Sequence, residues 1–241
     1  RRLTLEGAHV IGVAEIMPYS NGLNRNIAQC LEDFNIPLYL STTVSKVKGK
    51  RRLEEISLVN VDEKLNVIEG TEKTIKCDTL LLSVGLIPNL GITKDLNLKR
   101  NHKNLLDVYD NLETMKEGIF ACGNCLHVHD LVDNVSNEAR TAGFFASEYI
   151  KHKENCSEKI AIIPSNDFQY VIPEYLRLGR EYFELKFRSK NHLMNVKLVA
   201  RQQDKIIFTK FFKFLVPSEM EIVNIPLNDI AKEDIILEII T

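Results

Sequence analysis

The sequence contains no tryptophan, no long apolar run and no marked excess of charge of either sign. Aromatic residues make up 7% of the 241 residues, and the formal net charge is −2. A chain this close to neutral is not expected to bind nucleic acid or an anionic membrane surface. No apolar run approaches the ~20 residues that a membrane-spanning helix needs. The sequence therefore predicts a globular protein with no nucleic-acid partner and no membrane span.

Cysteine is scarce and irregularly placed, and the usual N-terminal signals are missing. The five cysteines are an odd, scattered set, which does not suit a disulfide framework. A reducing, cytoplasmic location is therefore predicted. The opening stretch "RRLTLEGAHV" has neither an initiator methionine nor the apolar core of a signal peptide. These features predict a fragment that begins inside a domain.

The sequence also lacks a G-x-G-x-x-G fingerprint, although its first residues have the pattern of half a βαβ unit. Residues 1–7 are typical of a final helical turn capped by Gly7. Residues 8–16 predict a short buried strand that carries Glu15 at its end. We expect the preceding strand and its glycine-rich turn to lie before Arg1.

The next elements predict a helix over residues 23–34 and an antiparallel meander over residues 36–77. The basic run Lys46–Arg52 favours a solvated hairpin turn over a phosphate patch, because it lies between two strand-like stretches. Buried strands are predicted at residues 78–85 and 118–122. A long helix is predicted from Leu131, where apolar residues recur every three or four positions.

The last 80 residues show the period-2 alternation of strands. In the clearest case, residues 182–189, three apolar side chains share one face, and Glu184, Lys186 and Arg188 share the other. Several strands at this spacing predict a β-sandwich. Because no convergent catalytic polar residues are evident in it, we expect a docking or oligomerisation module.

Two stretches carry the chemistry. "CDTLLLSVGLIPN" and "GIFACGN" each predict a buried strand that ends in a glycine, and they begin ~40 residues apart. Ligands of open α/β sheets bind at the carboxyl ends of strands, where glycine allows the backbone to approach a pyrophosphate. The first stretch contains Asp78, Gly85, Pro88 and Asn89, and the second contains Gly118, Ile119, Phe120, Ala121, Gly123 and Asn124.

With these motifs, residues 1–152 resemble the C-terminal part of a flavoprotein of the FAD/NAD(P)-dependent pyridine nucleotide-disulfide oxidoreductase superfamily. The segment "LHVHDLVDNVSNEA" resembles a branch often paired with a glycerol-3-phosphate-dehydrogenase-like flavoprotein. The resemblance implies an α/β fold: a partial two-dinucleotide-binding-domain (Rossmann-like) flavoprotein, followed by the β-sandwich. The expected domains are the remainder of the NAD(P)-binding domain (1–110), a C-terminal segment of the FAD-binding domain (111–156) and the β-domain (159–241), with a boundary near Cys156.

The resemblance also implies cofactor-binding residues. Gly123 and Asn124 would approach the FAD pyrophosphate or ribitol, and Asn124 stands where the family usually has aspartate. The helix beginning near Leu131 would direct its N-terminal amides, at Leu131 and Val132, toward the flavin. Asp130 is assigned to the FAD site, and capping of this helix by Asp130 or Asp133 is the structural alternative.

For the nicotinamide nucleotide, Glu15 is expected to accept the ribose hydroxyls, which favours NADH over NADPH, and Gly85 is expected to lie near the bound cofactor. Solvated strand-end and turn roles are the alternatives. Because both glycine-rich phosphate cradles are missing, the 241 residues alone are predicted to bind FAD and NAD poorly.

Cys122 and Cys125 have CxxC spacing beside His127 and His129. A flavin loop with incidental cysteines is favoured over a redox pair, and a metal site is the third alternative, because four convergent ligands would be unusually compressed. The two histidines are candidates for substrate contact or proton transfer, with hydrogen bonding in an ordered loop as the structural interpretation.

The sequence thus predicts an FAD-dependent oxidoreductase that transfers electrons or hydride between NAD(P)H and an acceptor or small-molecule substrate. Its partner would be that substrate, a redox partner protein or a flavoprotein subunit. One alternative is a non-catalytic binding subunit built on a degenerate flavoprotein. The other is a flavin-linked disulfide reductase that uses Cys122 and Cys125.

Overall fold

The computed structural model describes residues 1–241 apart from 21, 23, 102–103, 153–158, 178–179 and 228–229. The chain forms two compact units, Arg1–Val84 and Gly85–Thr241. This division falls inside the predicted domain 1–110, and the predicted boundary near Cys156 lies outside the described residues. The division into three domains therefore stays a prediction.

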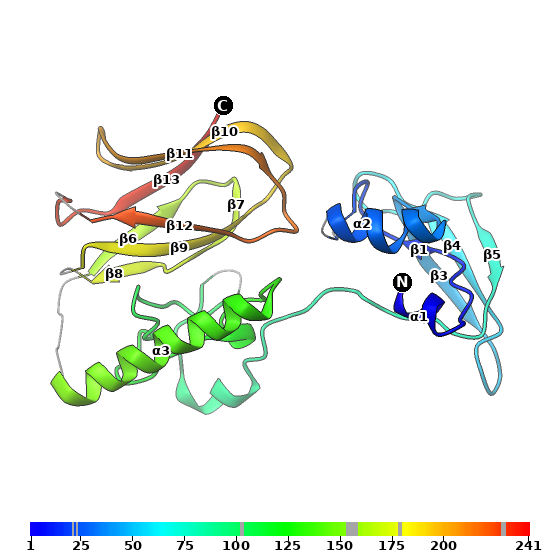
Figure 1. Cartoon of the computed structure of the whole chain (residues 1–241), viewed down its shortest axis with the longest axis horizontal. Helices are drawn as coiled ribbons and strands as arrows, with labels where there is room; N and C mark the ends of the chain where they lie inside the picture. Colours follow the sequence, from blue (N-terminus) through cyan, green and yellow to red (C-terminus); the bar gives the residue numbers. More distant parts are fainter. Residues whose placement is uncertain (21, 23, 102–103, 153–158, 178–179, 228–229) are drawn as a thin grey trace. The chain divides into compact units, whose positions relative to one another are not determined.

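The first unit combines a parallel pair of strands with a three-stranded antiparallel sheet (Figure 1). In the parallel pair, Val13 lies opposite Leu38. The other sheet has the order β3-β4-β5. The elements are α1 Arg2–Leu5, β1 Val13–Ala14, α2 Asn24–Cys30, the 3-10 helix η1 Glu32–Phe34, β2 Leu38–Tyr39, β3 Thr42–Lys48, β4 Glu55–Asn60 and β5 Lys73–Lys76.

Local turn chemistry in this unit follows the sequence. Gly7 has a φ of +92°, its N–H donates to the Thr4 carbonyl, and the Ala8 N–H donates to the Leu3 carbonyl. These two hydrogen bonds form a Schellman motif and confirm the predicted C-cap. The antiparallel pairing of β3 with β4 confirms the predicted hairpin, although Lys46–Lys48 are paired in β3 and only residues 49–52 of the basic run lie in the turn.

The strand predicted at residues 78–85 is wrong. Residues 77–90 form no helix or strand, and Leu82 and Val84 are 71% and 89% exposed. An apolar run becomes a buried strand only when neighbouring strands pair with it and other elements cover its faces. In the described part of the first unit, the parallel sheet consists of β1 and β2 alone, and neither pairs with this run.

The second unit begins with an irregular region that ends in a long helix. It contains the 3-10 helices η2 Gly91–Leu96 and η3 Gly123–Cys125, followed by α3 Val132–His152. Between η2 and η3, isolated antiparallel bridges join short turns, among them Glu113 with Phe120. The strand predicted at residues 118–122 is therefore reduced to a single bridge at Phe120, whereas the predicted long helix is confirmed.

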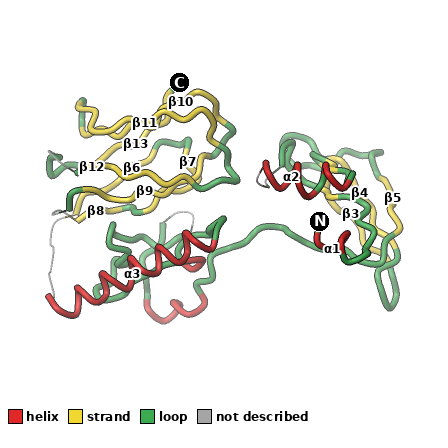
Figure 2. Tube along the Cα trace, in the orientation of Figure 1, coloured by secondary structure: helices red, strands yellow, loops and turns green. Residues whose placement is uncertain are grey.

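Residues 159–241 form the predicted β-sandwich (Figure 2). A five-stranded sheet has the order β11-β10-β13-β6-β8, and a three-stranded sheet has the order β12-β9-β7. The strands are β6 Lys159–Pro164, β7 Phe168–Ile172, β8 Tyr175–Arg177, β9 Tyr182–Ser189, β10 Leu193–Gln202, β11 Lys205–Leu215, β12 Glu221–Pro226 and β13 Ile235–Ile240.

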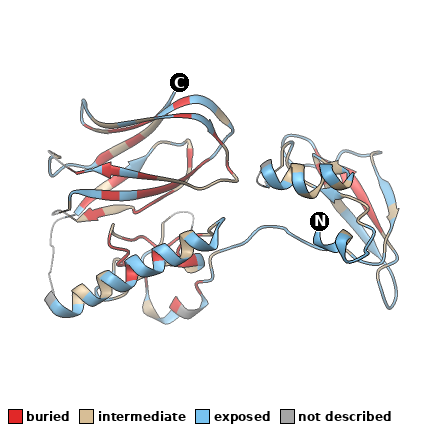
Figure 3. Cartoon of the chain, in the orientation of Figure 1, coloured by how far each residue is buried: buried red, intermediate tan, exposed pale blue. Residues whose placement is uncertain are grey.

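The sandwich encloses the larger hydrophobic core of the unit (Figure 3). Phe183, Leu185 and Phe187 of β9 are at most 1% exposed, as the alternation predicts. The Phe187 ring meets those of Phe168 and Phe212 edge-on, with ring centroids 5.4 and 6.0 Å away. These three rings join both sheets through β7, β9 and β11.

A buried carboxyl group attaches the irregular region to the sandwich. Glu174, between β7 and β8, accepts hydrogen bonds from the Val108 N–H at 3.0 Å and from the Asn101 amide at 3.2 Å. Burial, aided by the nearby Asp107, raises the pKa of Glu174 to about 8. The irregular region and the sandwich are thus held together partly by a carboxyl group that stays protonated at neutral pH.

Among the described helices, none combines the length and the apolar composition required to cross a membrane.

Replacing Phe187 with alanine should lower the free energy of unfolding by about 3–5 kcal/mol, because it leaves a cavity between the two sheets. Urea denaturation followed by circular dichroism measures the change. The matched control is Phe211→Ala on β11, where the ring is 56% exposed and the loss should stay below about 1 kcal/mol. Equal losses in the two variants would contradict this assignment of the core.

Candidate functional site

The second of the two predicted motifs lies in a loop that enters α3. Gly123 has a φ of +69°, where other residues are strained, and a Cβ on it would come within 3.4 Å of Val135. The short helix η3 is followed by His127 and His129, and the Asn124 side-chain oxygen accepts the His129 backbone N–H at 3.1 Å. We call residues 122–130 the glycine loop.

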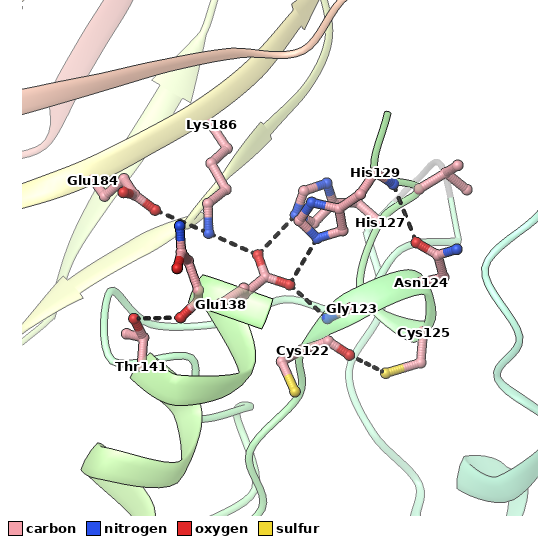
Figure 4. Close-up of polar contacts among 12 residues, drawn as sticks. Cys122, Gly123, Asn124, Cys125, His127, His129, Glu138, Thr141, Glu184 and Lys186 are labelled. Atoms are coloured by element: carbon pink, nitrogen blue, oxygen red, sulfur yellow. Dashed lines mark hydrogen bonds and ion pairs between the residues drawn. The ribbon is translucent and has the colours of Figure 1, made fainter. Parts of the chain in front are cut away.

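The centre of this region is the carboxylate of Glu138, which lies in the second turn of α3 (Figure 4). One carboxylate oxygen accepts hydrogen bonds from the Lys186 ammonium at 2.7 Å and from His127 Nε2 at 2.9 Å. The other oxygen accepts the Gly123 N–H at 2.6 Å and His129 Nε2 at 3.0 Å. All lone pairs of a buried carboxylate are thereby used by donors from the glycine loop and from β9.

The protonation of this cluster follows from its contacts. Burial lowers the pKa of His127, so the ring is neutral and carries its proton on Nε2, because a carboxylate can only accept. Burial by itself raises the pKa of Glu138, but the bonds from His127 and His129 and the charge of Lys186 hold it well below its usual range. The cluster therefore contains a charged Glu138–Lys186 pair.

A second set of bonds from the sandwich reaches the end of the glycine loop. Arg188 of β9 forms an ion pair with Asp130, and its guanidinium also donates to the Val128 carbonyl at 3.3 Å. Arg188 Nε donates to the Tyr170 hydroxyl at 3.1 Å, and that hydroxyl lies 3.3 Å from His127 Nδ1. Because His127 Nδ1 is unprotonated, the Tyr170 hydroxyl donates a hydrogen bond to it. The proton of the His127 ring is then on Nε2 and is directed toward Glu138.

The β-domain contributes converging polar side chains, whereas the sequence indicated only that it has no convergent catalytic ones. Tyr170, Lys186 and Arg188 all converge on the glycine loop. Alternation in β9 correctly placed Lys186 and Arg188 opposite the core. It could not show that this second face is also covered, since the same pattern describes a strand whose polar face meets water. Glu138 had no sequence signal beyond its position on α3.

The two cysteines of the loop are free thiols. The Cys125 thiol donates to the Cys122 carbonyl at 2.9 Å, and burial raises the pKa of Cys122. A raised pKa keeps the thiol protonated at neutral pH, whereas nucleophilic cysteines need the thiolate. This environment favours the interpretation of incidental cysteines in the loop.

The residues assigned to FAD lie together around the start of α3. Asn124, Asp130, Leu131 and Val132 are all exposed, and Val132 is 74% exposed. Because the Asn124 oxygen already accepts the His129 N–H, its amide nitrogen would serve as the donor to a hydroxyl. Asp130 bonds Arg188 and the Met220 N–H rather than the amides of α3, so the capping alternative is not what its carboxylate does here.

The two residues assigned to NAD lie in different units. Glu15 follows β1 and is half-buried, and one of its carboxylate oxygens accepts the Met17 N–H at 3.0 Å. Gly85 opens the second unit with a φ of +93° and with open space where a Cβ would stand.

His127, His129 and Glu138 offer ligand atoms within 4.8 Å of one another, a spacing that a metal ion could use. The sequence had suggested the cysteines as the other ligands, not Glu138. In this arrangement, however, the Lys186 ammonium lies 2.7 Å from a Glu138 oxygen and supplies the positive charge that a metal would bring. The geometry is therefore that of an internal ion pair with two histidine donors.

Comparison with known sequences gives a consistent result. The sequence model of the family described as pyridine nucleotide-disulphide oxidoreductase matches residues 6–143. A dihydrolipoyl dehydrogenase of Mycoplasma pneumoniae is 23% identical over 196 residues, or 77% of this chain and 41% of that protein. One of Mycoplasma genitalium is 24% identical over 52% of this chain and 29% of that protein. The chain spans less than half the length of either relative.

Solved structures share the fold. The thioredoxin reductase of T. acidophilum has a TM-score of 0.51 and 22% identity, with 58% of this chain and 44% of that chain covered. The thioredoxin reductase of Lactococcus lactis has a TM-score of 0.50 and 15% identity, with 58% and 45% covered. Together with the family match, these likenesses confirm the resemblance and the α/β fold class that the two motifs predicted.

Replacing Glu138 with glutamine should lower the free energy of unfolding by about 3–5 kcal/mol at pH 7, because it removes the fully buried counter-charge of Lys186 and leaves only the half-exposed Glu184. Below its ordinary pKa of about 4.5 the wild-type carboxylate also begins to lose this advantage. The difference between variant and wild type should therefore be largest near neutral pH and shrink on acidification. Thermal unfolding from pH 3 to pH 8 measures it.

Glu184→Gln is the matched control. Glu184 contacts the same Lys186 ammonium at 3.0 Å, but its side chain is 49% exposed. Its loss should therefore change the unfolding free energy by less than about 1 kcal/mol. A pH-independent loss in Glu138→Gln, or a loss no larger than that of the control, would show that the Glu138 charge is not the stabilising group.

Proposed function

Because the chain belongs to the pyridine nucleotide-disulphide oxidoreductase family, we propose that the protein is a flavoprotein oxidoreductase that passes electrons between NAD(P)H and an acceptor or small-molecule substrate. FAD, when bound, supplies the hydride chemistry. The protein then contributes binding, orientation and electrostatics. The observation that carries the proposal is the glycine loop, which places a left-handed Gly123 and the exposed start of a long helix side by side.

The residues present fit one side of an FAD site. Gly123 and Asn124 would lie along the pyrophosphate or ribitol, and Leu131 and Val132 would present backbone amides and apolar side chains to the flavin. A helix N-terminus favours negative charge, which suits a reduced flavin. Since its carboxylate is bonded to Arg188, Asp130 would act by holding the loop rather than by contacting the cofactor.

For the nicotinamide nucleotide, Glu15 would accept the ribose hydroxyls, and its negative charge would disfavour the 2′-phosphate of NADPH. Gly85 would allow the chain to pass close to the cofactor, because no side chain projects there. NADH is therefore the proposed donor.

His127 and His129 are retained as candidates for proton transfer. The geometry supports their structural role more directly, since both imidazoles donate to Glu138 and their side chains are at most 1% exposed. A proton from either ring would have to leave through this bonded cluster.

The acceptor is proposed only as a small-molecule substrate, a redox partner protein or a flavoprotein subunit, in a cytoplasmic setting. The non-catalytic binding subunit is distinguished from the enzyme by whether the protein carries a reducible flavin.

The first test uses the full-length gene product, purified in air without added cofactor. Its visible absorbance should show a flavin spectrum that NADH bleaches under anaerobic conditions, and more slowly with NADPH, because Glu15 would repel the 2′-phosphate. A colourless protein that carries stoichiometric zinc would contradict the proposal and would favour the metal interpretation of the histidine cluster.

The disulfide-reductase alternative is tested by Cys125→Ser. If electrons pass through the flavin without a cysteine pair, the rate of flavin reduction by NADH and the rate of its reoxidation should both stay within about twofold of wild type, since the protonated Cys122 is a poor nucleophile. Stopped-flow absorbance measures both rates. Loss of turnover with dithiol or disulfide substrates would instead identify a redox pair.

A further inference from the structure

Strand β9 buries side chains on both of its faces, and the two faces contact different parts of the unit. Phe183, Leu185 and Phe187 fill the sandwich core. On the other face, Lys186 reaches Glu138 and Arg188 reaches Asp130, so this face is covered by the glycine loop and α3. The side chains of Lys186 and Arg188 are only 6% and 10% exposed. Figure 4 shows the Lys186 side chain extending from the sheet to the Glu138 carboxylate.

Burying charged side chains in these positions has a large desolvation cost, and a β-sandwich can fold without burying them. Removing an ammonium group from water costs several kcal/mol unless a counter-charge and hydrogen bonds compensate it. A β-domain that served only for docking would be at least as stable with Lys186 in water. The ammonium is buried because it meets Glu138, 48 residues earlier in the chain.

The glycine loop depends on such side-chain contacts. Within it, the backbone bonds are short-range turns from Leu126 and His127 to the Gly123 carbonyl. Side chains within the loop add the bonds of Asn124 and Cys125 to its backbone. From outside the loop, Glu138 accepts the Gly123 N–H at 2.6 Å, and Arg188 donates to the Val128 carbonyl at 3.3 Å. The conformation of the loop is therefore set by α3 and β9 rather than by its own backbone.

We propose that Lys186 is a positioning residue for the flavin site: by compensating the Glu138 charge, it keeps Glu138 bonded to the Gly123 N–H and holds the glycine loop in its binding conformation. This inference rests on the proposed function. It makes the β-domain an integral part of the cofactor site, beyond its expected docking role. Arg188 supports the same loop through Asp130 and Val128.

The physical consequence of losing Lys186 is specific. An unpaired Glu138 carboxylate must either take up a proton or admit water, and both weaken its bond to Gly123. If Glu138 stays ionised, its negative charge remains buried beside the glycine loop. Negative charge near a flavin disfavours the electron-rich reduced form, so an ionised Glu138 should lower the midpoint potential, whereas a protonated Glu138 leaves the net charge unchanged. A purely structural role for Lys186 would not shift the potential in a defined direction.

The experiment compares Lys186→Met with Lys186→Arg and with Lys197→Met in the full-length protein. Lys197 is the matched control because it lies exposed on β10 of the same domain. Lys186→Met should weaken FAD binding at least tenfold and accelerate backbone hydrogen exchange in residues 122–130, and it should lower the flavin midpoint potential at pH values where Glu138 stays ionised. Lys197→Met should match wild type in all three readouts, and Lys186→Arg should restore most of the binding because it retains the charge.

A double variant, Lys186→Met with Glu138→Gln, guards against simple misfolding. Removing both charges leaves no unpaired ion, and glutamine can still accept the Gly123 N–H. FAD binding should therefore recover relative to Lys186→Met alone. A double variant that binds no better than Lys186→Met would overturn charge compensation as the mechanism.

The outcomes separate the two proposals. A wild-type protein that binds no FAD contradicts the proposed function and this inference together. A wild-type protein that binds FAD, with Lys186→Met equal to it in affinity and in exchange of residues 122–130, overturns the positioning role alone. Faster exchange with unchanged FAD affinity also overturns it, because the loop would then be clamped for a reason unrelated to the cofactor.

Discussion

The second unit depends on one buried carboxylate. Glu138 accepts bonds from a backbone amide, two imidazoles and an ammonium group, and these donors come from the glycine loop and from the β-sandwich. A carboxylate in this position is stable only because every lone pair is used and a cation compensates its charge. The loop, α3 and the sandwich are therefore linked by an arrangement in which each member needs the others.

The same arrangement explains how the glycine loop keeps its conformation without a regular strand before it. In the described residues, the chain reaches Gly123 through turns joined by single bridges, not through a sheet. The backbone at Gly123 is instead held from the side by Glu138, and the end of the loop by Arg188. Side-chain hydrogen bonds thus stabilise the loop here, as strand pairing does in an extended sheet.

Family membership and site geometry constrain different parts of the functional question. The family match covers residues 6–143 and thus includes the glycine loop but not β9. The contacts of Lys186 and Arg188 show that residues outside the matched region complete the surroundings of that loop. The same contacts oppose both alternative interpretations of the cluster. A metal ion would lie close to the positive charge of Lys186, and a redox thiol pair would include the protonated Cys122.

The sequence by itself determined the elements whose causes are local: the Gly7 cap, the hairpin around the basic run, the long helix after Leu131 and five strands of the sandwich. Its two glycine motifs also carried the resemblance that the family match confirms. Only the tertiary structure decided that residues 78–85 pair with no strand and that Lys186 and Arg188 are buried. Periodicity tells which side chains share a face. It does not tell what covers that face, since the covering residues, such as Glu138, lie far away in the chain.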